Sequence, residues 1–126
     1  MAQLPTVLLV EDSPTQAQQI AANLEAQSLR VVVADDGPVA LQLADEHQPD
    51  VIVLDINLPS MSGYQVCKRL KRDHNTAHIP VIMLTAADSS DNIMSGLEAG
   101  AEDYIPKDEF AAENLVVSLS SMGFIQ

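Results

Sequence analysis

Residues 50–55, DVIVLD, join an uninterrupted apolar run to a carboxylate at its end. The run is rich in Val and Ile, which is the pattern of a parallel β-strand covered on both faces. Four further short runs of this kind occur along the chain. The five expected strands are TVLLV (6–10), RVVVA (30–34), DVIVL (50–54), IPVIML (79–84) and DYI (103–105).

Amphipathic segments with helix-start signals separate these runs. Ser13 and Pro14 have the pattern of an N-cap and first helical residue, and apolar residues then recur at helical spacing. Alternating strands and helices with right-handed connections predict an α/β fold, a doubly wound parallel sheet with helices on both faces. Helices are expected from Ser13-Pro14, from Asp36-Gly37-Pro38, after Gly63, from Asp91 to a C-cap at Gly100, and from about Asp108.

Length and composition favour one domain spanning residues 1–126. The single cysteine cannot form an internal disulfide, which suits a reducing compartment. No stretch approaches the ~20 apolar residues that cross a membrane, and the N-terminus has no basic leader. We therefore expect a soluble, cytoplasmic protein without a membrane partner.

The net charge of −12 argues against a nucleic-acid partner, because such binding depends on Lys and Arg that neutralise phosphates. Four of the six basic residues lie together in K-R-L-K-R (68–72), which predicts a solvated helix face and helix end. The three histidines fall outside the strand ends. We expect them at the surface.

Polar side chains follow four of the expected strands. Glu11 and Asp12 follow the first, Asp55 the third, Thr85 the fourth and Lys107 the fifth. Each alone could be a helix cap or turn residue. Ligands of open α/β sheets bind at these carboxyl ends. If the first and third strands are neighbours, three carboxylates converge and require a cation, and such oxygens suit Mg²⁺.

Lys107 is the only Lys or Arg after Arg72, although that part of the chain carries nine Asp and Glu. With the hydroxyl of Thr85, its ammonium would supply donors for phosphate oxygens opposite the metal. Phosphoryl transfer requires this combination of positioning, metal and cation. Asp55 is then the expected nucleophile, which forms an aspartyl-phosphate.

Four motifs in this order and spacing resemble the receiver domain of two-component response regulators over essentially the whole chain. The resemblance implies a flavodoxin-like, five-stranded parallel sheet in the order 2-1-3-4-5 with five helices. The motifs are VEDSP (10–14), VLDINLP (53–59) with SG at 62–63, MLTA (83–86) and GAEDYIPK (100–107).

The resemblance implies that Asp55 accepts the phosphoryl group of a kinase phosphohistidine. Asp12 and Asp55 would bind Mg²⁺ directly, and the backbone carbonyl of Asn57 would be a further ligand. Glu11 would act through water or set the local field. Gly63 would allow the following helix to pack closely against this loop.

Thr85 and Lys107 would contact the phosphoryl group, and Thr85 and Tyr104 would form a switch pair that alters a protein-binding surface. The implied partners are a sensor histidine kinase or phosphotransfer protein and a downstream target protein. We expect a stand-alone receiver that is no conventional enzyme but catalyses its own phosphorylation and dephosphorylation. The sequence leaves open whether phosphorylation drives dimerisation.

One departure from the family pattern concerns the residues around Lys107. The family places a proline after the lysine, joined by a cis peptide bond, whereas here Pro106 precedes Lys107 and Asp108 follows it. A non-proline cis bond costs roughly 2.5–4 kcal/mol. We expect a trans Lys107–Asp108 bond, and Asp108 as the cap of the last helix.

Three alternatives use some of the same residues. A haloacid dehalogenase-type phosphatase would need a second acid where Asn57 stands. An FMN-binding flavodoxin would need a phosphate loop where Glu11 and Asp12 stand. A pseudo-receiver that acts as a non-phosphorylated interaction module should have lost a site residue, and none is missing.

Overall fold

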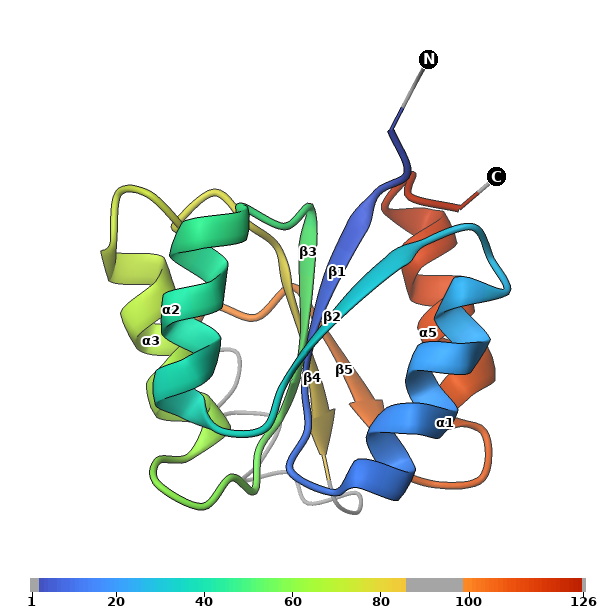
Figure 1. The fold of residues 1–126 in the computed structure, drawn as a ribbon, viewed down its shortest axis with the longest axis horizontal. Coiled ribbons are helices and arrows are strands. Elements are labelled where there is room, and N and C mark those ends of the chain that lie inside the picture. The colour runs from blue at the N-terminus through green and yellow to red at the C-terminus, as the bar shows by residue number, and fades with distance from the viewer. Residues whose placement is uncertain (1–2, 86–98, 126) are drawn as a thin grey trace.

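The computed structural model describes residues 3–85 and 99–125. Five parallel strands form one sheet in the order β2-β1-β3-β4-β5, as expected (Figure 1). The expected strands are all present, with ends that differ from the expected ones by at most two residues. They are β1 (Thr6–Val10), β2 (Arg30–Ala34), β3 (Val51–Asp55), β4 (Val81–Thr85) and β5 (Asp103–Pro106).

Helices cover both faces of the sheet, with α1 and α5 on one side and α2 and α3 on the other (Figure 1). Their bounds are α1 (Pro14–Glu25), α2 (Gly37–His47), α3 (Gly63–Arg72) and α5 (Ala111–Ser121). Most of the helix expected between Asp91 and Gly100 lies outside the described residues. Gly100 itself has a φ of 97°, the left-handed backbone of a C-cap glycine.

The helices begin where capping side chains are available. Ser13 accepts a hydrogen bond from the Gln16 amide ahead of α1. Ser62 and Gln65 form a reciprocal capping box at the start of α3. The expectation of Asp108 as a helix cap is wrong. Its side chain accepts from the Phe110 amide in a turn, and α5 begins three residues later than predicted.

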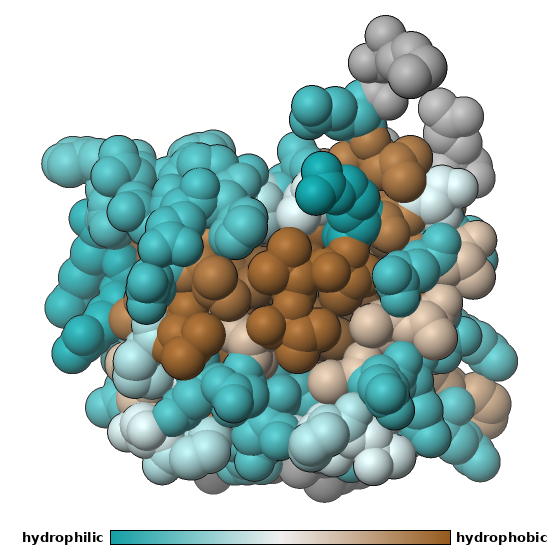
Figure 2. Space-filling model, viewed as in Figure 1, coloured by the Kyte–Doolittle hydropathy of each residue, from teal (hydrophilic) through white to brown (hydrophobic). Residues whose placement is uncertain are grey.

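The core consists of two apolar layers, one on each face of the sheet. Every residue of β3 and β4 is buried, because these central strands have neighbours on both sides and helices above and below. The edge strand β2 is only partly covered, and Figure 2 shows an apolar band where it runs across the view. No helix in the described part of the chain is long and apolar enough to cross a membrane.

The basic segment 68–72 is only partly a solvated face. The Lys71 ammonium donates to the Ile79 carbonyl at 2.7 Å and to Glu102 Oε1 at 3.1 Å, and the other Glu102 oxygen accepts from the Val81 amide. These bonds tie the end of α3 to the starts of β4 and β5. The histidines are exposed, as predicted.

Candidate functional site

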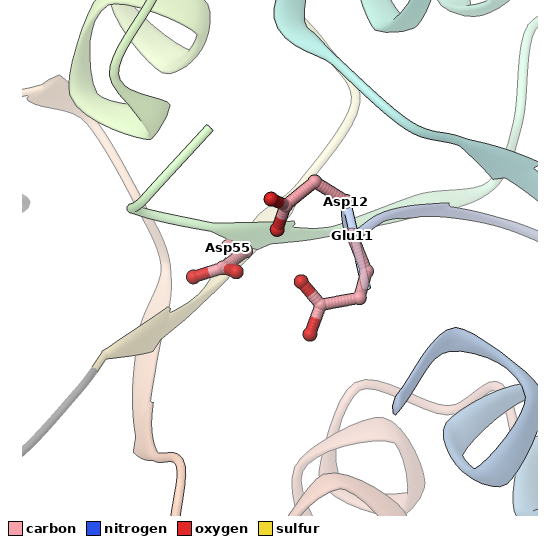
Figure 3. A group of neighbouring side chains, drawn as sticks. All are labelled: Glu11, Asp12 and Asp55. Carbon is pink, nitrogen blue, oxygen red and sulfur yellow. The ribbon is translucent and has the colours of Figure 1, made fainter. Parts of the chain in front are cut away.

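The acidic group lies where β1 and β3 end side by side. Val10 pairs with Leu54, so the residues that follow each of them come close together. Figure 3 shows the side chains of Glu11, Asp12 and Asp55 converging on a common space. One carboxylate oxygen from each lies within 4.8 Å of the others. The expected convergence of three carboxylates is confirmed.

Lys107 reaches this group from the end of β5. Its Nζ lies 2.6 Å from Glu11 Oε1 and 3.1 Å from Asp55 Oδ2. The Glu11 and Asp55 side chains are 0% and 3% exposed, and that of Lys107 is 20% exposed. A single ammonium therefore bridges two buried carboxylates.

The backbone around Lys107 explains how this side chain reaches the site although Pro106 precedes it and no proline follows it. The Lys107 amide donates to the Thr85 carbonyl at 2.6 Å, and the Asp108 amide donates to the Pro106 carbonyl at 2.9 Å. The second bond closes a three-residue turn centred on Lys107. All peptide bonds in residues 3–85 and 99–125 are trans. The expected trans Lys107–Asp108 bond is confirmed.

Burial and close charges set the protonation of the site. Burial raises the pKa of Glu11 to about 7, the neighbouring Asp55 adds to this rise, and Lys107 opposes it. Burial alone would lower the pKa of Lys107, but its bonds to Glu11 and Asp55 outweigh this effect, and the pKa is raised. Lys107 is therefore a fixed cation at neutral pH, whereas Glu11 titrates there.

A buried acceptor in this group lacks a donor. Glu11 Oε2 is buried and has no hydrogen-bond partner among the described residues. Three carboxylates also outnumber the one ammonium. Asp12 is exposed, so the group has an open side on which a cation can keep water ligands. The orphaned oxygen, the surplus negative charge and the hard oxygen donors fit Mg²⁺.

The loop after β3 is held tightly against Asp55. The Asn57 amide donates to Asp55 Oδ1 at 3.2 Å, and the Gly63 amide donates to the Ile56 carbonyl at 2.8 Å. A Cβ on Gly63 would lie 2.3 Å from the Asp55 carbonyl oxygen. Only glycine allows α3 to begin this close to the end of β3, which confirms the close packing expected at Gly63.

Thr85 lies on β4, the strand next to β3, and Tyr104 lies on β5, the strand next to β4. Thr85 ends β4, is 4% exposed and pairs with Pro106. Tyr104 pairs with Met83, is partly buried and packs against the apolar layer under α2 and α3. Ala86, the small residue after Thr85, lies outside the described residues.

The sequence interpretation missed the direct contact between Glu11 and Lys107, because it gave Glu11 a role through water. The signal was present in the strand alternation. Val7 and Leu9 lie on one face of β1, which is buried under α1 and α5, and Glu11 continues this alternation just after the strand and is also buried. A carboxylate continuing this row is expected to be buried and to need a cation.

Comparison with known proteins points to one family. The sequence profile of the response regulator receiver domain matches residues 7–120. The response regulator PleD of Caulobacter vibrioides is 42% identical over 101 residues, which are 80% of this chain and 22% of PleD. The matched part of this chain corresponds to 45–51% of the length of several other curated relatives.

Solved structures agree with this match. The chemotaxis protein CheY4 of Vibrio cholerae has a TM-score of 0.87 and 30% identity, over 94% of this chain and 98% of that one. The receiver domain of the sensor histidine kinase PA1611 from Pseudomonas aeruginosa has a TM-score of 0.85 and 31% identity, over 95% and 98% of the two chains. That structure has a magnesium ion coordinated in its active-site cleft.

Proposed function

Because the chain belongs to the response regulator receiver domain family, we propose that it is a phosphoacceptor of a two-component phosphorelay, in which Asp55 takes a phosphoryl group from a kinase phosphohistidine. One observation carries this proposal. The Lys107 ammonium bridges Glu11 and Asp55 at 2.6 and 3.1 Å, and an Asp12 oxygen lies within 4.8 Å of both carboxylates.

Asp55 acts as the nucleophile in the proposed reaction. One of its carboxylate oxygens attacks phosphorus, so an O–P bond forms as the N–P bond of the phosphohistidine breaks. The electron pair of the broken bond stays on the imidazole, which takes a proton from water. Attack by water on the aspartyl-phosphate later restores the carboxylate and releases phosphate.

Lys107 and Thr85 stabilise the transferred group. Lys107 is already within hydrogen-bond distance of Asp55, so its ammonium faces oxygens of a phosphoryl group attached there. Glu11 holds that ammonium in place from the other side. Thr85 ends the strand beside Asp55 and is the hydroxyl that would follow the phosphoryl group, with Tyr104 turning behind it.

Asp12, Asp55 and the Asn57 carbonyl would hold Mg²⁺, with Glu11 as an outer contributor. The ion supplies positive charge that neutralises the carboxylates and the phosphoryl oxygens. Asp12 is exposed, so such an ion would enter the site from the side on which this carboxylate lies. The buried carboxylates of Glu11 and Asp55 fix the rest of the site through Lys107.

We infer that proteins are the partners of this domain. A sensor histidine kinase or phosphotransfer protein would supply the phosphoryl group, and a downstream target would bind the surface altered by Thr85 and Tyr104. The net charge of −12 favours protein over nucleic-acid targets. We place the protein in the cytoplasm, where it would receive the phosphoryl group from such a kinase.

Intact-mass spectrometry after incubation with acetyl phosphate and Mg²⁺ tests this function. We expect one added phosphoryl group on the wild type, and none with EDTA or on Asp55→Asn. Asp50→Asn, which changes the aspartate just before β3, at the opposite end of this strand from Asp55, is the matched control and should be phosphorylated. A wild type that binds Mg²⁺ but gains no phosphoryl group would support the pseudo-receiver alternative instead.

A further inference from the structure

The outer edge of β2 carries free backbone hydrogen-bonding groups. The Arg30 amide donates to the Pro5 carbonyl, and the Ala34 carbonyl accepts from the Glu11 amide, so these residues direct their backbone toward β1. Backbone groups alternate along a strand, so Val31 and Val33 direct theirs away from the sheet. No strand of the described chain pairs with that side.

The same edge is apolar and unprotected. Figure 2 shows it as an apolar band between polar surfaces, in the place where β2 runs in Figure 1. Val33 is 45% exposed, and Val39 at the start of α2 is 40% exposed. Exposed edges are usually blocked by a charge, a proline or a bulge, and none of these interrupts Val31–Ala34.

The charges at the two ends of this edge are opposite. Arg30 is the only Lys or Arg before Lys68, and Asp35 and Asp36 follow the strand directly. Arg30 and Asp35 are exposed, and their side chains have no hydrogen-bond or ion-pair partner in residues 3–85 and 99–125. A second strand of the same sequence, running antiparallel, brings each arginine to the acidic end of the other.

We propose that the β2 edge binds the β2 edge of a second copy of this chain. A twofold axis at Val32 sets Val31 opposite Val33 of the second copy, where both backbones face outward and exchange N–H···O=C bonds. Val32 faces its own counterpart, and such β-branched cross-strand pairs are favourable. Arg30 lies beside the Asp35–Asp36 end of the second copy, and one sheet runs through both chains.

This contact uses no residue of the acidic site, so it stands independently of the proposed phosphorylation. The interface is small, and small interfaces are weak. We expect a dissociation constant on the order of 10–100 µM. Sedimentation equilibrium of the unphosphorylated protein, over a concentration range that reaches about 500 µM, measures it.

Val33→Lys tests the edge directly, since it places a charge on the strand without filling the core. It should raise the dissociation constant at least about tenfold. Val117→Lys is the matched control, because Val117 is 63% exposed on α5, away from β2, and it should leave the constant unchanged. Far-UV circular dichroism and thermal melting confirm that both variants are folded.

The charge pairing has its own test. Arg30→Asp and Asp35→Arg should each weaken the dimer about threefold or more, and the double variant should recover wild-type association. A wild type that stays monomeric at about 500 µM overturns the proposal. So does a dimer that withstands Val33→Lys, or one that Val117→Lys disrupts.

Discussion

Lys107 balances the charge of the acidic site at the scale of single residues. It is the one cation within hydrogen-bond distance of Glu11 and Asp55 in the described chain. Because both carboxylates are buried, their repulsion without it would be poorly screened. A cation, from the side chain or from a metal, therefore stabilises the two carboxylates in their ionised form.

Lys107→Met should therefore destabilise the metal-free protein. Removing one partner of a buried ion pair costs about 3–5 kcal/mol, and because Lys107 is 20% exposed we expect a smaller loss of about 1–3 kcal/mol in the free energy of unfolding. Urea unfolding at neutral pH in EDTA measures it. Lys68→Met, an exposed lysine on α3, is the control, and an equal loss in both variants would contradict the assigned role.

The pKa of Glu11 predicts a specific pH dependence of stability. The pKa is about 7 in the folded chain and 4.5 when unperturbed. Between these values the folded state binds more protons than the unfolded state, so the free energy of unfolding falls as pH rises from about 4.5 to about 7. Glu11→Gln should flatten this slope.

Urea unfolding in EDTA at a series of pH values across that window measures the slope. Glu25→Gln, an exposed glutamate at the end of α1, should keep the wild-type slope. If Glu11→Gln and the wild type lose stability in parallel, the titration belongs to another group.

At the scale of elements, the start of α3 sets the position of Asp55. Gly63→Ala would push a methyl group to 2.3 Å from the Asp55 carbonyl oxygen, against backbone that cannot move aside. We expect a loss of about 1–3 kcal/mol in stability and slower phosphorylation by acetyl phosphate.

Gly37→Ala gives a comparison, because the nearest atoms there are the flexible side-chain atoms of Met61. Its stability loss should be smaller and its phosphorylation rate unchanged. Equal phosphorylation rates in Gly63→Ala and the wild type would show that α3 does not position Asp55.

Lys71 joins three elements that the sequence pattern could not connect. Its bonds to Ile79 and Glu102 link α3, β4 and β5. Lys71→Met should lower the free energy of unfolding by about 1–2 kcal/mol, whereas Arg69→Met, on the exposed side of α3, should change it by less than about 0.5 kcal/mol. Chemical denaturation distinguishes the two, and equal effects would contradict the linking role.

The elements themselves were largely predictable from sequence. The apolar runs located all five strands, and Ser13-Pro14 located the start of α1. The start of α5 was misplaced because Asp108 is a turn former as well as a cap. Its side chain accepts from the Phe110 amide, and its own amide donates to the Pro106 carbonyl in the tight turn around Lys107. Lys71 was misjudged because helical spacing does not show which long side chains reach back to another element.

At the scale of the whole molecule, strand order brings the site together. The order β2-β1-β3-β4-β5 makes Asp12 and Asp55 neighbours and lets Lys107 reach Asp55 across the end of β4. The sequence predicted this order only through the family resemblance. Contacts between side chains, such as the bridge from Lys107 to Glu11, depend on rotamers and local turns that the strand order alone does not define.

Locating the acyl phosphate in the chain shows whether Asp55 is the phosphoacceptor. After incubation with acetyl phosphate and Mg²⁺, borohydride reduction converts a phosphorylated aspartate to homoserine, and peptide fragmentation locates the change. We predict homoserine at position 55 and at no other aspartate. Homoserine at Asp12 or Asp50 with an unchanged Asp55, or none at all despite Mg²⁺ binding, would contradict the role of Asp55 as phosphoacceptor.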